Sequence, residues 1–299
     1  MKSKAFLFII LSGLLWGSSG VFVKFLSPYG FTPLQMTFVR GFIAFVGLSL
    51  YALIFDRSMF VIKPKRIFAY AAVGVLLFST AVLYYTAIGM TSIPTAVVLM
   101  YTSPIYVTAF SALFLGEKLT LPKAGAIGLM LVGSALVSGI VGNFSADLLG
   151  IIIGLLSGVI YAAYNIVAKI LFSKGDNPKS VSLYSFLFMA LTASFFSQPA
   201  ALADRIAQKP TATLPLLIGL GVCTYVLPFF LYNISLKTLS AGTASALGVI
   251  EPMAATVYSI VIFRDIPDVY SIIGIVMVLA AVVLIGVIEN RHMSEKEAT

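Results

Sequence analysis

One carboxylate lies beside a proline in the middle of a long apolar run. Glu251 and Pro252 occur in the stretch LGVIEPMAAT, inside an apolar run from about Gly242 to Phe263 that is long enough to cross a bilayer. An ionised carboxylate at that depth is unfavourable unless it is paired or hydrated. Glu251 must therefore face a polar cavity or hold a proton, and either state suits a carrier that couples protons to a substrate. A structural acid, protonated or paired with an arginine, is the equally weighted alternative.

Pro252 predicts a bend in the helix at the same point. Proline has no N–H, so the carbonyl four residues earlier loses its helical partner. A free carbonyl at membrane depth is tolerated beside protein or water but not beside lipid, and we expect the Glu251–Pro252 corner to face the interior. Pro104 repeats this pattern with the carbonyl of Met100, and Ser103 takes the place of the acid. A plain kink without a role in transport is the alternative.

Arg40 is a second charge at membrane depth. It lies about seven residues into the apolar run 33–55, which is too deep for an ordinary loop charge, although the side chain could snorkel to the outer surface. We expect it to pair with Glu251 or to bind a substrate carboxylate through its guanidinium fork. Structural pairing is the interpretation that the sequence favours.

Aromatic, amide and hydroxyl side chains recur at similar depths in other apolar runs. A tyrosine offers an apolar ring face and a hydroxyl group, which suits a small organic solute. The predicted substrate-binding residues are Trp16, Tyr84, Tyr101, Ser103, Tyr161, Asn165, Tyr225, Tyr232, Asn233 and Glu251, and the predicted coupling or gating residues are Glu251, Arg40, Pro104 and Pro252. For each aromatic residue taken singly, helix packing or an interfacial position is the alternative. We expect about half of the aromatic and amide set to line a cavity.

The composition places these residues in a membrane protein. Of the 299 residues 60% are hydrophobic and 10% are charged, with a mean hydropathy of +1.05, whereas a soluble domain carries about 25% charged residues. The net charge of +8 comes from basic residues in short loops, which indicates membrane topology rather than nucleic-acid binding. A single cysteine, Cys223, and a single histidine, His292, leave no Cys/His metal cluster, and no Walker motif is present. We expect no metal and no cofactor.

Ten segments are long and apolar enough to be spanning helices, so the predicted fold is an all-α membrane protein. They cover about 5–26, 33–55, 67–89, 94–115, 123–140, 148–172, 180–202, 214–236, 242–263 and 269–288. With the N-terminus in the cytoplasm, fourteen of the 19 basic residues lie on the inner side, four lie outside, and Arg40 lies within a segment. The positive-inside rule therefore predicts cytoplasmic N- and C-termini.

The chain contains an internal repeat with an offset of 148 residues. The matched pairs include Tyr84 with Tyr232, Ser92 with Ser240, Pro104 with Pro252 and Glu117 with Asp265, while the stretch 16–24 matches 161–169 at an offset of 145. Each unit holds five helices, and duplicating an odd number inverts the second copy in the membrane. The predicted domains are a first repeat at 1–142, an inverted second repeat at 143–290 and a polar cytoplasmic tail at 291–299.

Two further groups of residues are predicted to be structural. The glycine pairs Gly13/Gly17 and Gly125/Gly128 are expected to permit close helix contact rather than to bind anything. Glu117 and Asp265 close two helices at opposite membrane faces, where acids oppose the helix dipole. They are expected to bond neighbouring helix N-termini or basic residues, as structural or gating groups.

On these motifs the chain resembles the drug/metabolite transporter superfamily, EamA type, over essentially its whole length. The features that carry the resemblance are LLWGSSGVFVK, TFVRGFIA and the paired ends SPIYVTAFSALFLGEKL and EPMAATVYSIVIFRDI. The second half ends in Arg264-Asp265 where the family has Gly-Glu, which keeps the acid. The resemblance implies a secondary transporter of ten helices and leans towards export.

The leading hypothesis is thus a secondary active transporter, not an enzyme, in the plasma membrane. It would move a small organic metabolite such as an amino acid by alternating access, with protons as the coupling ion. The alternative is an intramembrane enzyme acting on a lipid or isoprenoid, although the acids are scattered and the histidine lies in the tail. A non-transporting membrane scaffold is a third possibility. Two complete halves in one chain allow a monomer to suffice, and a homodimer is equally compatible.

Overall fold

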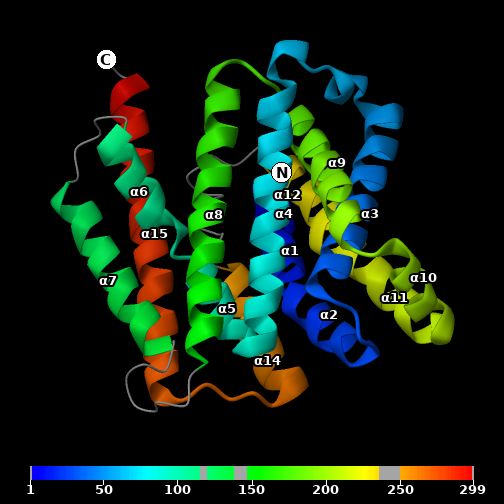
Figure 1. Ribbon diagram of the computed structural model, residues 1–299. Helices are drawn as coiled ribbons and strands as arrows, with labels where there is room; N and C mark the ends of the chain where they lie inside the picture. Colours follow the sequence, from blue (N-terminus) through cyan, green and yellow to red (C-terminus); the bar gives the residue numbers. More distant parts are fainter. Residues whose placement is uncertain (1, 115–119, 138–146, 236–249, 298–299) are drawn as a thin grey trace.

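The chain folds into a bundle of helices (Figure 1). The structure is a computed structural model that describes residues 2–114, 120–137, 147–235 and 250–297. Within these ranges the fold is all-α and no strand occurs. The helices are α1 (Lys2–Gly17), α2 (Ser19–Leu26), α3 (Pro33–Phe55), α4 (Ile67–Met90), α5 (Ile93–Met100), α6 (Ser103–Phe114), α7 (Leu121–Val137), α8 (Leu148–Ser173), α9 (Pro178–Phe196), α10 (Pro199–Gln208), α11 (Pro210–Gly221), α12 (Leu227–Ser235), α14 (Ile250–Phe263) and α15 (Val269–Glu297). Short 3₁₀ turns cover Ser27–Tyr29, Arg57–Phe60 and Pro64–Arg66, and a π-helical turn covers Val222–Val226.

The described helices include stretches suited to crossing a membrane. Six are long and apolar: Lys4–Tyr29, Pro33–Phe55, Pro64–Met90, Leu148–Ser173, Pro178–Phe196 and Pro210–Tyr232. Four shorter apolar helices are Ile93–Val107, Ala124–Val137, Ile250–Phe263 and Val269–Leu284. Each predicted apolar run overlaps with one of these stretches, which confirms the prediction of an all-α protein with several candidate membrane spans. Large apolar side chains such as Phe55, Phe68 and Phe195 are exposed on the outside, where lipid would cover them.

Local sequence signals explain where several helices begin. Thr32 caps α3 in a reciprocal capping box with Gln35, and proline occupies the first helical position. Ser92, Asp147 and Asn177 cap α5, α8 and α9 with their side-chain oxygens. These caps satisfy backbone N–H groups that the first turn of each helix leaves without partners.

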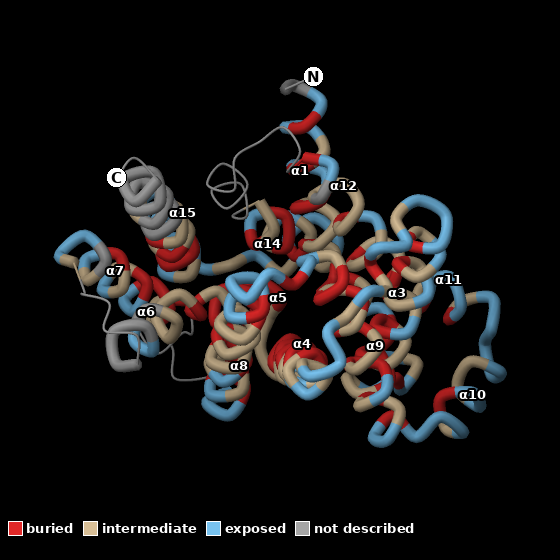
Figure 2. Tube along the Cα trace, turned by 90° about the horizontal axis from the view of Figure 1, so that it is seen from above, coloured by how far each residue is buried: buried red, intermediate tan, exposed pale blue. Residues whose placement is uncertain are grey.

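The helices pair between the two halves of the chain. α3 packs on α9, α7 packs on α15, α4 packs on α8, and α1 packs on α12. In Figure 1 the chain runs in opposite directions in the pairs α3/α9, α4/α8 and α7/α15. Figure 2 shows α7 and α15 at one edge of the bundle, α10 and α11 at the other, and α4, α5 and α8 between them.

Ion pairs join the two halves at both ends of the bundle. At one end, Lys179 on α9 donates to Asp56 after α3 at 2.6 Å, and Arg66 before α4 pairs with Asp176 before α9. At the other end Lys24 on α2 pairs with Asp265 after α14 at 3.4 Å. The loops around 56–66 and 174–179 therefore meet at one end of the bundle.

The Asp56–Lys179 pair predicts a pH-dependent contribution to stability. The hydrogen bond from Lys179 holds the pKa of the Asp56 carboxyl below its ordinary value. This contribution is present above the unfolded pKa of about 3.9 and is lost as the pH falls through the folded pKa. We expect Asp56→Asn to lower the free energy of unfolding at pH 7 by about 1 kcal/mol or less, because both side chains are partly exposed. Thermal melts of the purified protein between pH 3 and pH 7 measure the effect.

The matched control is Asp204→Asn. Asp204 is exposed on α10 and forms no ion pair in the part of the chain that the structure describes. Its melting temperature should match the parent at each pH. If Asp56→Asn lowered the melting temperature as much at pH 3 as at pH 7, the stabilising role of the Asp56–Lys179 pair would be contradicted.

Candidate functional site

Glu251 lies in the first described turn of α14 and faces the interior of the bundle. Met253 and Val257, on the opposite side of the helix, are 52% and 53% exposed. Ala255 and Ser259, one and two turns along from Glu251 on its own side, are fully buried. The carboxylate therefore points towards the other helices and away from the surface that lipid would cover.

Tyr101 is the hydrogen-bond partner of this carboxylate. Its hydroxyl group donates to Glu251 Oε2 at 2.8 Å. Tyr101 lies where α5 ends and α6 has not begun, and the N–H of Thr102 bonds back to Leu99 in a tighter turn. This interruption comes directly before Pro104 and confirms the predicted break. For Pro252, the preceding residues on which its predicted bend depends lie outside the described residues.

Close packing against α1 fixes the backbone of Glu251. A Cβ atom added at Gly17 would lie 2.7 Å from the carbonyl oxygen of Glu251, and one at Gly13 would lie 2.8 Å from the side chain of Ile250. The predicted role of Gly13 and Gly17 in helix contact is thus confirmed. The same prediction for Gly125 and Gly128 is wrong within the described structure, because no described neighbouring atom approaches within 4 Å of an added Cβ at either position.

Arg40 on α3 is buried among tyrosines, with only 7% of its surface exposed. Its Nη1 donates to the hydroxyl of Tyr85, its Nη2 lies 3.4 Å from the carbonyl oxygen of Thr224, and its guanidinium carbon lies 3.7 Å from the ring centroid of Tyr225. No ion pair joins Arg40 to Glu251 in the described part of the chain. The guanidinium is therefore held by neutral phenols and a carbonyl.

Most of the predicted aromatic residues gather around these two charges. Tyr84 and Tyr85 belong to one core cluster, and Tyr101 and Tyr161 pack against it. Tyr101 bonds to Glu251, while Tyr85 and Tyr225 contact Arg40. Tyr161 stacks on Tyr164 with ring centroids 5.7 Å apart. Tyr84, Tyr101, Tyr161 and Tyr225 thus belong to one group with Glu251.

The other predicted residues are more scattered. Trp16 and Tyr232 pack against each other with ring centroids 5.5 Å apart. The side chain of Asn165 donates to the carbonyl of Tyr161 within its own helix. Ser103 is buried at the start of α6, and the side chain of Asn233 lies outside the described residues.

Tyr85 and Tyr164 belong to the same group but were not predicted from the sequence. The Tyr85 hydroxyl accepts a hydrogen bond from Arg40, and the Tyr164 ring stacks on that of Tyr161. Tyr85 directly follows Tyr84, and Tyr164 lies three residues after Tyr161, which is one helical turn. This closeness in sequence to two predicted residues is the signal from which Tyr85 and Tyr164 could have been predicted.

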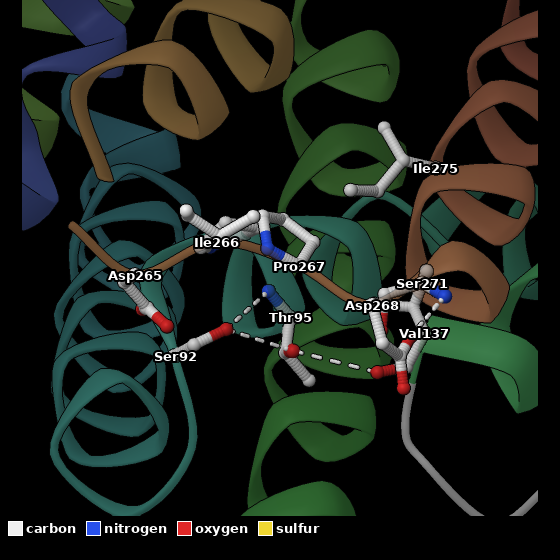
Figure 3. Close-up of a pocket in the computed structure, with 10 residues that line it drawn as sticks. Ser92, Thr95, Val137, Asp265, Ile266, Pro267, Asp268, Ser271 and Ile275 are labelled. Atoms are coloured by element: carbon white, nitrogen blue, oxygen red, sulfur yellow. Dashed lines mark hydrogen bonds between the residues drawn. The ribbon is translucent and has the colours of Figure 1, made fainter. Parts of the chain in front are cut away.

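A separate hollow of about 290 Å³ lies at the end of the bundle where α5 and α15 begin (Figure 3). Asp265 lines it, pairs with Lys24 and accepts from Ser259 at 3.1 Å. Asp268 caps α15 through the N–H of Ser271, and this bond lowers the pKa of the Asp268 carboxyl. These acids bond to a basic residue and a helix N-terminus, as was predicted for Asp265. Glu117, its counterpart in the repeat, lies outside the described residues.

The model of the EamA-like transporter family matches the chain twice, over residues 3–139 and 148–287. The chain belongs to the EamA-like transporter family. As an EamA protein it is a multi-pass membrane transporter, and the predicted resemblance is confirmed.

Individual proteins agree with the family assignment. An uncharacterized transporter of Archaeoglobus fulgidus is 29% identical, covering 92% of this chain and 94% of its own. A protein of Rickettsia prowazekii named S-adenosylmethionine uptake transporter is 24% identical, covering 88% of this chain and 85% of its own. A solved structure described only as "Crystal structure of protein" shares the fold with a TM-score of 0.64 at 17% identity, covering 97% of this chain and 99% of that one.

The contact between α1 and α14 yields a direct test. Gly17→Ala should lower the free energy of unfolding by about 1–3 kcal/mol, because the new methyl group must push α1 away from Glu251 and Ala254. Gly128→Ala meets no described atom and should leave stability unchanged or raise it by up to about 1 kcal/mol through helix propensity. Thermal melts in detergent compare the two variants. Equal melting temperatures would contradict the close approach.

Proposed function

We propose that this EamA protein is a proton-coupled secondary active transporter that moves a small organic metabolite, such as an amino acid, across the cytoplasmic membrane by alternating access. The observation that carries the proposal is the hydrogen bond between Tyr101 and Glu251. It joins the broken fourth span to the ninth, at a carboxylate that must be paired, hydrated or protonated at that depth. A group that changes its partner when it gains a proton can link proton movement to substrate movement.

The proposed architecture is two inverted five-helix repeats, divided near residue 142, with both termini in the cytoplasm. Two helix contacts support it. The second span, α3, packs on the seventh, α9, and the fifth span, α7, packs on the tenth, α15, so that each of these spans contacts the equivalent span of the other repeat. The contact α1/α12 in turn corresponds to the contact α4/α8, because α1 is equivalent to α8 and α12 is equivalent to α4 in the repeat. Counterparts that run antiparallel imply a pseudo-two-fold axis in the membrane plane, which is the arrangement that alternating access uses.

The proposed binding region lies between the halves and uses the tyrosine group around Glu251 and Arg40, with Trp16, Ser103, Asn165, Tyr232 and Asn233 as further candidates. Pro104 and Pro252 are proposed as the bends at which the two central spans move. The direction that we propose is export, following the family resemblance, while the relative from Rickettsia prowazekii is named for uptake. The enzyme alternative has no specific observation in its favour, since the matched relatives are named transporters.

Flux through proteoliposomes tests the proposal. Purified protein should move at least one solute from a panel of labelled amino acids and related metabolites, and a pH gradient should drive accumulation. Glu251→Gln should reduce gradient-driven accumulation by at least about tenfold, because an amide cannot carry the proton. Assays with solute loaded inside and outside establish the direction.

The matched control is Asp268→Asn, which makes the same change from acid to amide outside the apolar spans. Asparagine retains the oxygen that caps α15, so both accumulation and exchange should persist. If no solute moved under any gradient, the transporter proposal would fail. If Glu251→Gln accumulated solute as the parent does, the coupling role of Glu251 would fail and the carrier would stand.

A further inference from the structure

Arg40 is a buried charge that contacts no counter-charge among the described residues. In the described part of the chain its partners are the hydroxyl of Tyr85, the carbonyl of Thr224 and the ring of Tyr225, all of them neutral. A charge this deeply buried is costly unless an opposite charge and further hydrogen bonds compensate it. An anionic group bound at the Arg40 guanidinium would therefore supply the missing counter-charge.

The unused hydrogen-bonding capacity of Arg40 lies on one edge of the guanidinium. Nη1 donates to Tyr85, while Nε is buried and has no hydrogen-bond partner in the part of the chain that the structure describes. Nη2, which shares an edge with Nε, has only the long contact of 3.4 Å to Thr224. Two parallel N–H groups on such an edge match the two oxygens of a carboxylate.

Two further structural features lie next to Arg40. Thr224 and Tyr225 lie in the π-helical turn Val222–Val226, a rare irregularity that is frequent at functional sites. Thr37 lies three residues before Arg40 on α3, and its hydroxyl oxygen is also buried and has no hydrogen-bond partner among the described residues. The unpaired donors thus occur on adjacent turns of one helix, opposite an irregular turn of another.

Glu251 supplies the second half of a recognition pattern. Tyr101 donates to its carboxylate and packs against the same core cluster as Tyr85, which accepts from Arg40. Glu251 and Arg40 form no ion pair in the described part of the chain. A molecule with a carboxylate at one end and an ammonium group at the other would satisfy both charges. A simple organic cation would leave Arg40 unpaired, and a phosphate dianion would be repelled by Glu251.

We infer that Arg40 is the carboxylate subsite of the transporter and that the substrate is an α-amino acid or a similar zwitterion, with its ammonium group at Glu251. This inference rests on the proposed transport function and specifies its substrate class. Tyr225 stacks on the guanidinium and Tyr85 fixes its orientation. The Nε–Nη2 edge then recognises the substrate carboxylate.

Competition among matched ligands tests the inference. The twenty common L-α-amino acids are screened for exchange in proteoliposomes of the wild-type chain, and each transported one is compared with its carboxamide and its decarboxylated amine. Removing the carboxylate should weaken competition by at least about tenfold, as expected when a charged, bidentate hydrogen bond is lost. A carboxamide or amine that competes as well as the acid overturns the inference.

Variants assign the discrimination to Arg40. In Arg40→Gln, the amino acid and its carboxamide should compete for exchange equally well. Arg40→Lys keeps the charge but not the forked pair of N–H groups, and its preference for the acid over the carboxamide should be intermediate. Tyr85→Phe keeps the charge of Arg40 but removes the hydroxyl that orients it, and should weaken the preference for the acid without abolishing it. Discrimination that persists unchanged in Arg40→Gln overturns the assignment. If the variants do not fold, the wild-type comparison decides alone.

Failure of the inference and failure of the proposed function give different results. A transported solute that lacks a carboxylate, with no amino acid transported, overturns the zwitterion site and leaves the carrier intact. Absence of transport for every solute tested removes the carrier itself.

Discussion

A carboxylate inside an apolar bundle must be compensated, and this constraint organises the centre of the molecule. Glu251 turns away from the lipid-facing side of α14, and Tyr101 donates a hydrogen bond to it from the break between α5 and α6. Gly13 and Gly17 allow α1 to lie directly against the same turn of α14. The break, the close helix contact and the surrounding tyrosines are thus different ways of holding one charge inside an apolar bundle.

The two halves share their helix contacts but differ in chemistry. α3 and α9 pack on each other, yet α3 carries Arg40 where the matched position of α9 carries Ser185. Likewise Ser103 stands where the second half has Glu251. A cation on one side and an anion on the other make the centre chemically polar although the backbone repeats. In the proposed carrier this asymmetry would orient a substrate, while the repeated backbone would provide two related conformations.

The sequence predicted the apolar runs, the break before Pro104 and the contact through Gly13 and Gly17, because each depends on local chemistry or on a strong compositional signal. It did not predict that Tyr85 and Tyr225 enclose Arg40. Those contacts depend on how each helix is rotated, and helices that are apolar on all sides give little periodic signal for rotation. The π-helical turn had no signal for the same reason. Gly125 and Gly128 show that small residues permit a close approach but do not ensure one.

The central claim is that Glu251 lies in a polar interior that water reaches. Cys223 is the only cysteine, so replacing it with alanine gives a background in which Glu251→Cys carries a single thiol. The measurement is the rate at which a charged, water-soluble thiol reagent and an uncharged, lipid-soluble one label this position in sealed vesicles, with Met253→Cys as the lipid-facing control. The account predicts that the charged reagent labels position 251 at a measurable rate and does not label position 253. Labelling of position 251 by the lipid-soluble reagent alone would contradict it.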